Sequence, residues 1–226
     1  MTTTPPTLVL LSGGQHHGNR KLHQALAELV LSKRKKLTYI PFCAEDSDIF
    51  FRRIIRRYKS YGFQDFFCLP VDAPISKKDI LKALRNDAIY LAGGNTFYFL
   101  KYLKESGLAK ELIRYAKDGG ILAGLSAGAH ILTKNIQLAG YPEYTADENF
   151  VQLKNLTSLG LANFEFYPHY YNSPKLSDAL LKYSKKTKNK IYACPDGSGV
   201  VVKDKTTIIY GKATLFYRGE KTQLIP

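Results

Sequence analysis

A glycine-rich segment around Ser126 carries the most distinctive chemistry in the sequence. The short apolar run 121–123 leads into Gly124-Leu125-Ser126-Ala127-Gly128, and a second apolar run, 129–136, follows. The pattern Gly-x-Ser-x-Gly between a strand and a helix is typical of a nucleophile elbow, in which a tight turn exposes the serine hydroxyl beyond the strand. The alternative is an ordinary serine in a glycine-rich turn, so the rest of the chain must supply a base and an acid.

A serine hydroxyl needs a general base, and the chain has five histidines. His169 is the best candidate, because it follows a predicted strand at 164–167 and Pro168 fixes the backbone ahead of it. A hydrogen-bonded structural role is the alternative for this residue. His130 is the rival, but it lies inside the helix that starts at the serine and is expected to point away. Of the others, His16 and His17 are expected on the first loop and His23 on an exposed helix.

The orienting acid is expected between the serine and the histidine, where Asp147 and Glu148 lie in an irregular segment. A carboxylate on the second imidazole nitrogen would fix the tautomer and stabilise the imidazolium. A solvated loop acid is the alternative for both residues. The residues alone do not choose between the two carboxylates.

Two backbone N–H groups are expected to hold the oxyanion. One is that of Ala127, directly after the nucleophile, and the other is that of Gly94, which with Gly93 lets the chain approach closely. The segment Gly93-Gly94-Asn95 also fits a plain turn in which Asn95 caps the next helix, and the two roles are compatible.

Composition limits the class of protein. The chain has 226 residues, of which 45% are apolar, so a full hydrophobic core is expected. No apolar run is long enough to span a membrane, and the first six residues do not resemble a signal peptide. Cys43, Cys68 and Cys194 are odd in number and widely spaced, which favours reduced thiols in a cytoplasmic protein.

The net charge of +14 raises the question of nucleic acid. The basic residues fall into separate clusters at 33–36, 52–57 and 182–190, each on a predicted helix or at a helix end. Such clusters usually form solvated faces, and no nucleic-acid motif accompanies them. Nucleic-acid binding is therefore not expected to be the main role.

Strand-like runs and helical spacing alternate through the first part of the chain. We predict strands at 7–12, 37–42, 65–70 and 88–92 and helices at 19–33, 47–58, 76–86, 97–106 and 108–118. In the second helix Ile49, Phe50, Ile54 and Ile55 are predicted to face inward. This alternation predicts a mostly parallel sheet with helices on both faces. Gly13-Gly14, Gly93-Gly94 and Ser126 would then meet at the carboxyl edge, where such sheets place their sites.

The pattern changes after residue 136. We predict an irregular segment at 137–158, a strand at 164–167, a helix at 176–184 and strands at 190–193, 199–203, 206–210 and 213–217. The last three are predicted to form an antiparallel meander added to the sheet. No linker marks a boundary, so residues 1–226 are expected to form one catalytic domain.

Several segments resemble one family. They are Ala92-Gly93-Gly94-Asn95-Thr96-Phe97, Gly124-Leu125-Ser126-Ala127-Gly128-Ala129, Pro168-His169-Tyr170, Ala146-Asp147-Glu148-Asn149 and Pro195-Asp196-Gly197-Ser198. In order and spacing they are similar to the peptidase E family, the alpha-aspartyl dipeptidases related to cyanophycinases. The resemblance implies a flavodoxin-like, three-layer α/β/α sandwich similar to class I glutamine amidotransferases. It also implies Ser126 as nucleophile, His169 as base, Asp147 as acid and no metal or organic cofactor.

The sequence departs from the family pattern at two places. Ala92 stands where the family usually has a third glycine. Selectivity for aspartate needs a cation, yet residues 170–175 and the helix after them contain lysines and no arginine. Lysine does not replace a bidentate arginine, so the reaction type is better supported than a preference for aspartate.

We therefore expect a cytoplasmic serine exopeptidase that hydrolyses short peptides. Dipeptides with an N-terminal Asp are among the candidate substrates. Gly93, Asn95 and Glu148 are candidate substrate-binding residues, and Asn95, Asp147 and Glu148 are the candidates for the free amine. A small peptide is the expected partner, with no membrane partner and with the chain a monomer or homodimer. The alternatives are an esterase or cyanophycin-type hydrolase on the same fold and a non-catalytic, basic binding protein.

Overall fold

A mostly parallel sheet forms the centre of the protein in the computed structural model, which describes residues 5–13, 18–32 and 34–224. Its five parallel strands are β1 (Thr7–Leu11), β2 (Lys35–Ile40), β3 (Phe63–Cys68), β4 (Ala88–Leu91) and β5 (Ile121–Leu125). Two antiparallel strands, β8 (Gly199–Lys203) and β9 (Thr206–Tyr210), extend it beyond β1, and the order is β3-β2-β4-β5-β1-β8-β9. The sequence after residue 198 thus lies beside the first strand of the chain.

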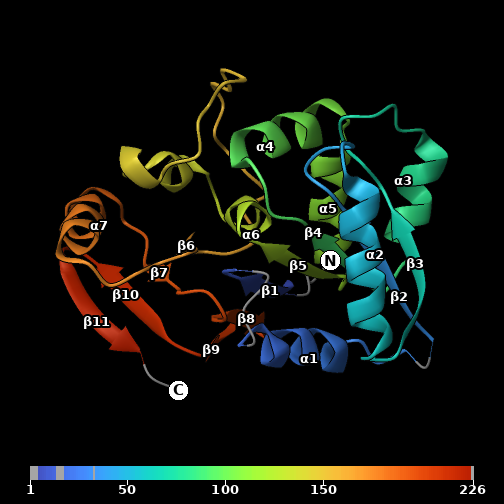
Figure 1. Ribbon diagram of the computed structural model, residues 1–226, viewed down its shortest axis with the longest axis horizontal. Coiled ribbons are helices and arrows are strands. Elements are labelled where there is room, and N and C mark those ends of the chain that lie inside the picture. Colours follow the sequence, from blue (N-terminus) through green and yellow to red (C-terminus); the bar gives the residue numbers. More distant parts are fainter. Residues whose placement is uncertain (1–4, 14–17, 33, 225–226) are drawn as a thin grey trace.

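Helices cover both faces of this sheet (Figure 1). One face packs against α1 (Asn19–Leu29) and α2 (Ser47–Lys59), and the other against α3 (Lys77–Leu84), α4 (Thr96–Glu105), α5 (Leu108–Lys117) and α6 (Ala127–Leu132). The side chains of β1 alternate between the two faces: Val9 and Leu11 pack in the core under α1 and α2, whereas Leu8 and Leu10 pack in the core on the other face. Because both faces are covered, all four side chains are buried. The predicted three-layer α/β/α sandwich is confirmed.

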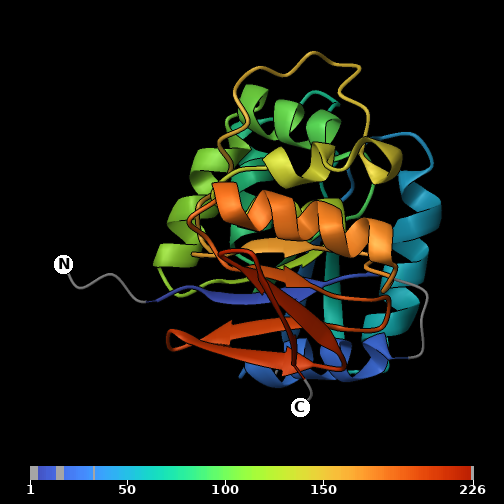
Figure 2. The ribbon, with the colours of Figure 1, turned by 90° about the vertical axis from the view of Figure 1, so that its left-hand side faces the viewer.

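A second, smaller sheet lies at one side of the molecule (Figures 1 and 2). Its strands are β6 (Glu165–Tyr167), β7 (Ile191–Ala193), β10 (Ala213–Tyr217) and β11 (Glu220–Leu224), in the order β11-β10-β7-β6. Helix α7 (Pro174–Lys186) packs across it, and Leu176 and Leu180 meet Phe216 in a separate small core. Figure 2 shows α7 (orange) and the dark-red strand β11 on the side of the molecule that faces the viewer.

The predicted meander is therefore wrong in one respect. Strands β8 and β9 join the main sheet, but β10 pairs with β7 in the second sheet, and β11 was not predicted. The chain turns between the two sheets at Gly211, which has a φ of 78°, and the Lys212 N–H is held there by the Ser198 hydroxyl. Local strand patterns do not specify which of two available sheet edges a strand will join.

Two details of the helices bear on the predictions. Ser76 caps α3 in a reciprocal capping box with Asp79. In α2, Ile54 is buried, whereas Ile49 and Phe50 are 42% and 45% exposed, so the predicted inward face is wrong at its first turn. Phe50 instead borders a cavity on the α1/α2 side of the sheet.

The connection between α6 and β6 is irregular except for two short 3-10 helices, η1 (Gln137–Gly140) and η2 (Glu143–Thr145). It is tied to α4, because Asn95 Nδ2 donates to the Glu148 carbonyl and Lys104 Nζ donates to that of Asn155. None of the helices in the described ranges is long and apolar enough to cross a membrane.

Candidate active site

Ser126 stands at the carboxyl end of β5, where the strand turns into α6. Its backbone has φ 50° and ψ −106°, an unusual conformation for a residue other than glycine. The turn is held because the Ser126 N–H donates to the Leu11 carbonyl at 2.9 Å. Strained backbone of this kind persists only where the surroundings enforce it, and it is frequent at functional sites.

His169 lies within hydrogen-bond distance of the serine. Its Nε2 is 2.8 Å from Ser126 Oγ, and it follows β6 by one proline. Its own φ is 54°, and its backbone N–H donates to the Ser12 hydroxyl at 2.7 Å. The structure therefore brings Ser126 and His169 together from two different sheets.

The carboxylate on the other side of the imidazole is Asp196. Its Oδ1 is 2.7 Å from His169 Nδ1. A carboxylate can only accept this bond, so Nδ1 carries the proton and Nε2 is free to accept one from Ser126. Both side chains are about half exposed, at 53% for His169 and 52% for Asp196.

Sheet topology explains why Asp196 lies at this edge. Strand β8 runs antiparallel to β1, and Gly199 at its start pairs with Leu11 at the end of β1. The residues just before an antiparallel strand therefore reach the same edge as those just after a parallel one. The prediction that Asp147 orients His169 is wrong. The carboxylate bonded to His169 is that of Asp196, which follows the histidine in the chain but lies beside it in space.

Gly13 makes room for this carboxylate. A Cβ at position 13 would lie 2.0 Å from Asp196 Oδ1 and 2.2 Å from its Cγ, which is closer than real atoms approach. No side chain larger than hydrogen is compatible with Asp196 where it stands. Gly13 lies at the carboxyl edge as predicted, but its contact with Asp196 was not predicted. Gly14, His16 and His17 lie outside the described residues.

Ser12 connects the segments that carry these side chains. It is fully buried, its hydroxyl accepts the His169 N–H and donates to the Cys194 carbonyl at 2.7 Å, and its N–H donates to the Ser198 carbonyl at 3.0 Å. One serine at the end of β1 therefore fixes the backbone of the base and of the segment that holds Asp196. This role of Ser12 could not be predicted, because nothing in the local sequence distinguishes it from the last residue of a strand.

Asp147 has a different environment. Its Oδ2 accepts the Thr96 N–H at 2.8 Å and also the Thr96 hydroxyl, at the first residue of α4. Its own N–H donates to the Ala139 carbonyl at 2.9 Å. These bonds hold the carboxylate at the amino end of a helix, a favourable place for negative charge.

Asp147 and Ser126 nevertheless line one cavity of about 160 Å³. The other lining residues are Thr96, His130, Leu138, Ala139, Tyr141, Thr145, Tyr167, Pro168, His169 and Tyr171. Of these described residues none is lysine or arginine. The cavity thus offers apolar and aromatic walls, one carboxylate and the hydroxyl of the serine.

His130 belongs to the wall of this cavity, although it was expected to point away from the serine. It is 6% exposed, and burial, together with the nearby His169, lowers its pKa to about 3. It is therefore neutral at ordinary pH. The Ser126 hydroxyl bonds to His169 instead.

Ala127 and Gly94, the two residues predicted to hold the oxyanion, both lie in turns at the carboxyl edge of the sheet. Ala127 is the first residue of α6, so its N–H has no partner within the helix. Gly94 has a φ of 141°, and a Cβ there would lie 2.3 Å from the ring of Phe42. This turn thus needs glycine, both for its backbone angle and for the packing of Phe42.

The remaining predicted residues have mixed positions. Gly93 faces the serine, since a Cβ on it would lie 3.5 Å from Ser126 Cβ. Asn95 caps α4 through Oδ1, which accepts the Tyr98 N–H, so the capping alternative is confirmed. Glu148 is exposed, and neither it nor Asn95 lines the cavity.

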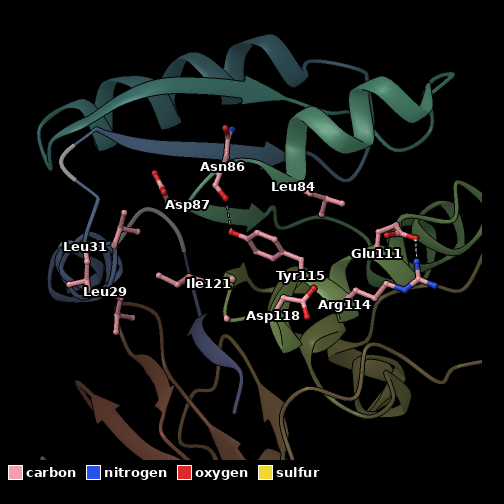
Figure 3. A pocket seen from close by; sticks show the side chains of 13 residues that line it. Leu29, Leu31, Leu84, Asn86, Asp87, Glu111, Arg114, Tyr115, Asp118 and Ile121 are labelled. Carbon is pink, nitrogen blue, oxygen red and sulfur yellow. Dashed lines mark hydrogen bonds and ion pairs between the residues drawn. The ribbon is translucent and has the colours of Figure 1, made fainter. Parts of the chain in front are cut away.

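A cavity of about 610 Å³ lies at the opposite end of the parallel strands (Figure 3). It borders Ile121, the first residue of β5, whereas Ser126 follows the last. Several of its polar groups have partners: Tyr115 donates to the Asn86 carbonyl, and Glu111 pairs with Arg114 (Figure 3). It holds no nucleophile with an adjacent base, and no described group of three or more His, Cys, Asp or Glu is placed to hold a metal ion.

Comparison with known proteins agrees with this geometry. Residues 8–210 match the profile of peptidase family S51. An uncharacterized peptidase from Listeria innocua is 29% identical over 77% of this chain and 83% of its own, and a peptidase E from Streptomyces coelicolor is 24% identical over 94% and 88%. A protein of Drosophila melanogaster named as a probable alpha-aspartyl dipeptidase is 29% identical over 72% and 65%. A crystal structure from Listeria monocytogenes, provisionally named peptidase E, superposes with a TM-score of 0.68 at 26% identity, covering 90% of this chain and 97% of that one.

Proposed function

The chain belongs to peptidase family S51 and is a serine peptidase, and we propose that it is an exopeptidase that releases neutral N-terminal residues from short peptides. The observation that carries the mechanism is the continuous chain of hydrogen bonds from Ser126 Oγ through His169 to Asp196, at 2.8 and 2.7 Å. Nucleophile, base and orienting acid in this arrangement are the parts that acyl transfer requires.

In the proposed reaction Ser126 Oγ attacks the scissile carbonyl while His169 Nε2 accepts the hydroxyl proton. Asp196 stabilises the imidazolium that forms. The N–H groups of Ala127 and Gly94 stabilise the oxyanion. His169 then gives the proton to the departing amine, and water hydrolyses the acyl-enzyme with His169 again acting as base.

We assign the free amine of the substrate to Asp147. This carboxylate lines the same cavity as Ser126 but is bonded to Thr96 rather than to His169. An ammonium group next to it would gain a charge-assisted hydrogen bond, which blocked peptides could not form. A cavity of about 160 Å³ favours one residue before the scissile bond, as in an exopeptidase.

The walls of this cavity argue for neutral N-terminal side chains. Tyr141, Tyr167 and Tyr171 line it, and the lining residues in the described chain include no cation to pair with an aspartate side chain. An acidic side chain would instead face Asp147, and like charges at close range repel. Release of N-terminal aspartate, the activity named for the Drosophila relative, is therefore not our first choice of substrate.

A fluorophosphonate probe tests the nucleophile. Wild type should be labelled, and Ser126→Ala should neither be labelled nor retain more than about a thousandth of kcat. Equal labelling of both would overturn the assignment of Ser126. Labelling without hydrolysis of any peptide, but with hydrolysis of esters, would favour the esterase alternative.

A panel of dipeptides tests the specificity. Neutral N-terminal residues should be released with kcat/KM at least about tenfold above that of N-terminal Asp, and N-acetylated peptides should not be cleaved. A preference for Asp would contradict the assigned role of the cavity walls while leaving the serine mechanism in place.

The expected cytoplasmic location accompanies this proposal and is supported by Cys43, Cys68 and Cys194, which are unpaired thiols.

A further inference from the structure

Two adjoining cavities lie on the α1/α2 side of the sheet, next to the glycine turn. One, of about 300 Å³, is lined by Gly93 and Gly94 of the turn and by Phe42. The other, of about 200 Å³, is lined by Arg53 and Arg57 of α2. The residues that line both are Tyr39, Phe50 and Leu125. This shared wall makes them one groove, which we call the α2 groove.

The α2 groove begins beside the nucleophile. Leu125 directly precedes Ser126, and Gly93 faces the Ser126 side chain. The groove shares no lining residue with the cavity that contains Asp147. A peptide whose carbonyl is at Ser126 can therefore place its N-terminal residue in the Asp147 cavity and its departing portion in the α2 groove.

The far part of the groove is basic. Arg53 is exposed, with its guanidinium carbon 5.4 Å from the centre of the Phe50 ring, and Arg57 is half-buried one helical turn further on. Two guanidinium groups on one wall match a carboxylate, which arginine binds through paired N–H donors. Arg53 and Arg57 of the basic cluster at 52–57 thus line a cavity and do not only form a solvated face.

Tyr90 adds an unused hydroxyl to this wall. Its side chain is 1% exposed, it lines the cavity of Arg53 and Arg57, and its hydroxyl has no hydrogen-bond partner among the described residues. Burial raises the pKa of Tyr90, and the charge of Arg57 opposes that rise. A buried hydroxyl without a partner is costly, and a ligand oxygen in the groove would relieve that cost.

The near part of the groove has the opposite charge. Glu45, which is exposed, is the one carboxylate among the described residues that line either cavity, and it belongs to the cavity at the glycine turn. A negative group of the substrate would therefore be repelled near the scissile bond and attracted at the far end. This polarity matches a peptide whose departing portion ends in a carboxylate.

We propose that the α2 groove binds the departing portion of the substrate and that Arg53 and Arg57 recognise a carboxylate on it, with the Tyr90 hydroxyl as an additional donor. The proposal rests on the proposed function, because it requires Ser126 to be the nucleophile. The carboxylate has two sources with the same chemistry, namely the C-terminus of a short peptide and an acidic side chain.

Three tripeptides with the same neutral N-terminal residue test this. One has a free C-terminus, one a C-terminal amide, and one an amide with Glu in the departing portion. Arg53→Gln should lower kcat/KM about tenfold, mainly through KM, for the peptides with a carboxylate and leave the neutral amide within about twofold. Arg56→Gln is the matched control, since this exposed residue of the same helix carries the same charge but lines neither cavity.

The outcomes are distinct. A preference for the free acid over both amides identifies the C-terminus, and a preference for the Glu amide over the neutral amide identifies the side chain. If Arg53→Gln and Arg56→Gln act alike, or if neither changes the ratio of acid to amide, the α2 groove does not read a carboxylate.

Failure of the groove proposal can be told from failure of the proposed function. The neutral amide should still be cleaved by wild type and not by Ser126→Ala, whatever Arg53 does. If no peptide is cleaved, calorimetry with Ser126→Ala decides the groove question, because equal Kd values for the free acid and its amide overturn it.

Discussion

The parallel half of the main sheet and the strands that follow residue 164 contribute to the site in different ways. The parallel half supplies Ser126 and, in the proposed mechanism, the oxyanion N–H groups, all from turns that close a single strand. His169 comes from the end of β6 in the second sheet, and Asp196 precedes β8. The first half thus positions its groups by local turns, whereas the second half depends on pairing between distant segments.

Replacing the two acids separately tests this contrast most strongly. Asp196→Asn should lower kcat by about 10³- to 10⁴-fold, because the amide no longer holds the productive imidazole tautomer. Asp147→Asn should act mainly on KM for peptides with a free amine. Steady-state kinetics on one dipeptide compare the two, and a larger loss of kcat in Asp147→Asn would return the role of acid to the irregular loop.

Gly13→Ala should displace the acid without removing it. Its Cβ would meet Asp196 Oδ1, so the carboxylate must shift, and a displacement of about 1 Å can cost about 10²-fold in kcat. In the double variant with Asp196→Asn, Gly13→Ala should have almost no additional effect, since both act on the same carboxylate. Additive losses in this cycle would mean that Gly13 acts elsewhere.

Ser12→Ala should have a smaller effect, about tenfold in kcat, because His169 loses the acceptor of its backbone N–H but keeps both side-chain bonds. The matched control is Ser198→Ala, which removes the acceptor of the Lys212 N–H near the same edge without contact to His169. Comparable losses of thermal stability in both variants, with loss of kcat only in Ser12→Ala, would support a positioning role. Equal kcat in the two variants would contradict it.

The α1/α2 layer also contributes to stability, and its histidine should reveal this as a pH dependence. His23 is 3% exposed, not on an exposed surface as predicted, and burial, with the charge of Arg57, lowers its pKa to about 3 from 6.5. The unfolded chain therefore takes up a proton that the folded chain refuses. This part of the stability is complete above pH 6.5 and declines as the pH falls toward 3.

Urea unfolding of wild type and His23→Leu between pH 7.5 and 4 measures this term. The variant loses the bond to Tyr58 and should be less stable at pH 7.5, but its pH profile should be flatter by up to about 1.4 kcal/mol per pH unit. His130 titrates in the same direction in both proteins and so does not affect the difference. Parallel profiles would contradict the account of His23.

Local patterns sufficed for the parallel half. The spacing around Ser126 and the apolar runs of β1 to β5 follow from strand and helix periodicity within a few residues, so the sandwich and the turn that carries Ser126 could be predicted. His169 could be placed because a short strand ends just before it. The prediction that β6 ends at the same edge of the sheet as Ser126 rested on the family resemblance as well as on the residues.

Asp196 could not be found in this way. The pattern Asp196-Gly197 is typical of a turn, and its position at the site depends on β8 pairing antiparallel with β1, some 190 residues earlier in the chain. Two signals pointed to it: the segment Pro195-Asp196-Gly197-Ser198 belongs to the family resemblance, and Gly13 at the end of β1 lacks a side chain that would collide with Asp196. The acidic pair at 147–148 was more conspicuous in the sequence, but the Asp147 carboxylate accepts a hydrogen bond from the Thr96 N–H at the start of α4.

The pairing of β1 with β8 also sets the moment at which activity can appear during synthesis. The edge that β1 presents to β8 stays open until residues 199–202 have been made, about 190 residues later in the chain. A nascent chain of about 190 residues contains the serine and the histidine but lacks the carboxylate at position 196. In the proposed mechanism, a chain that has been made only as far as residue 195 lacks the orienting acid and should be nearly inactive.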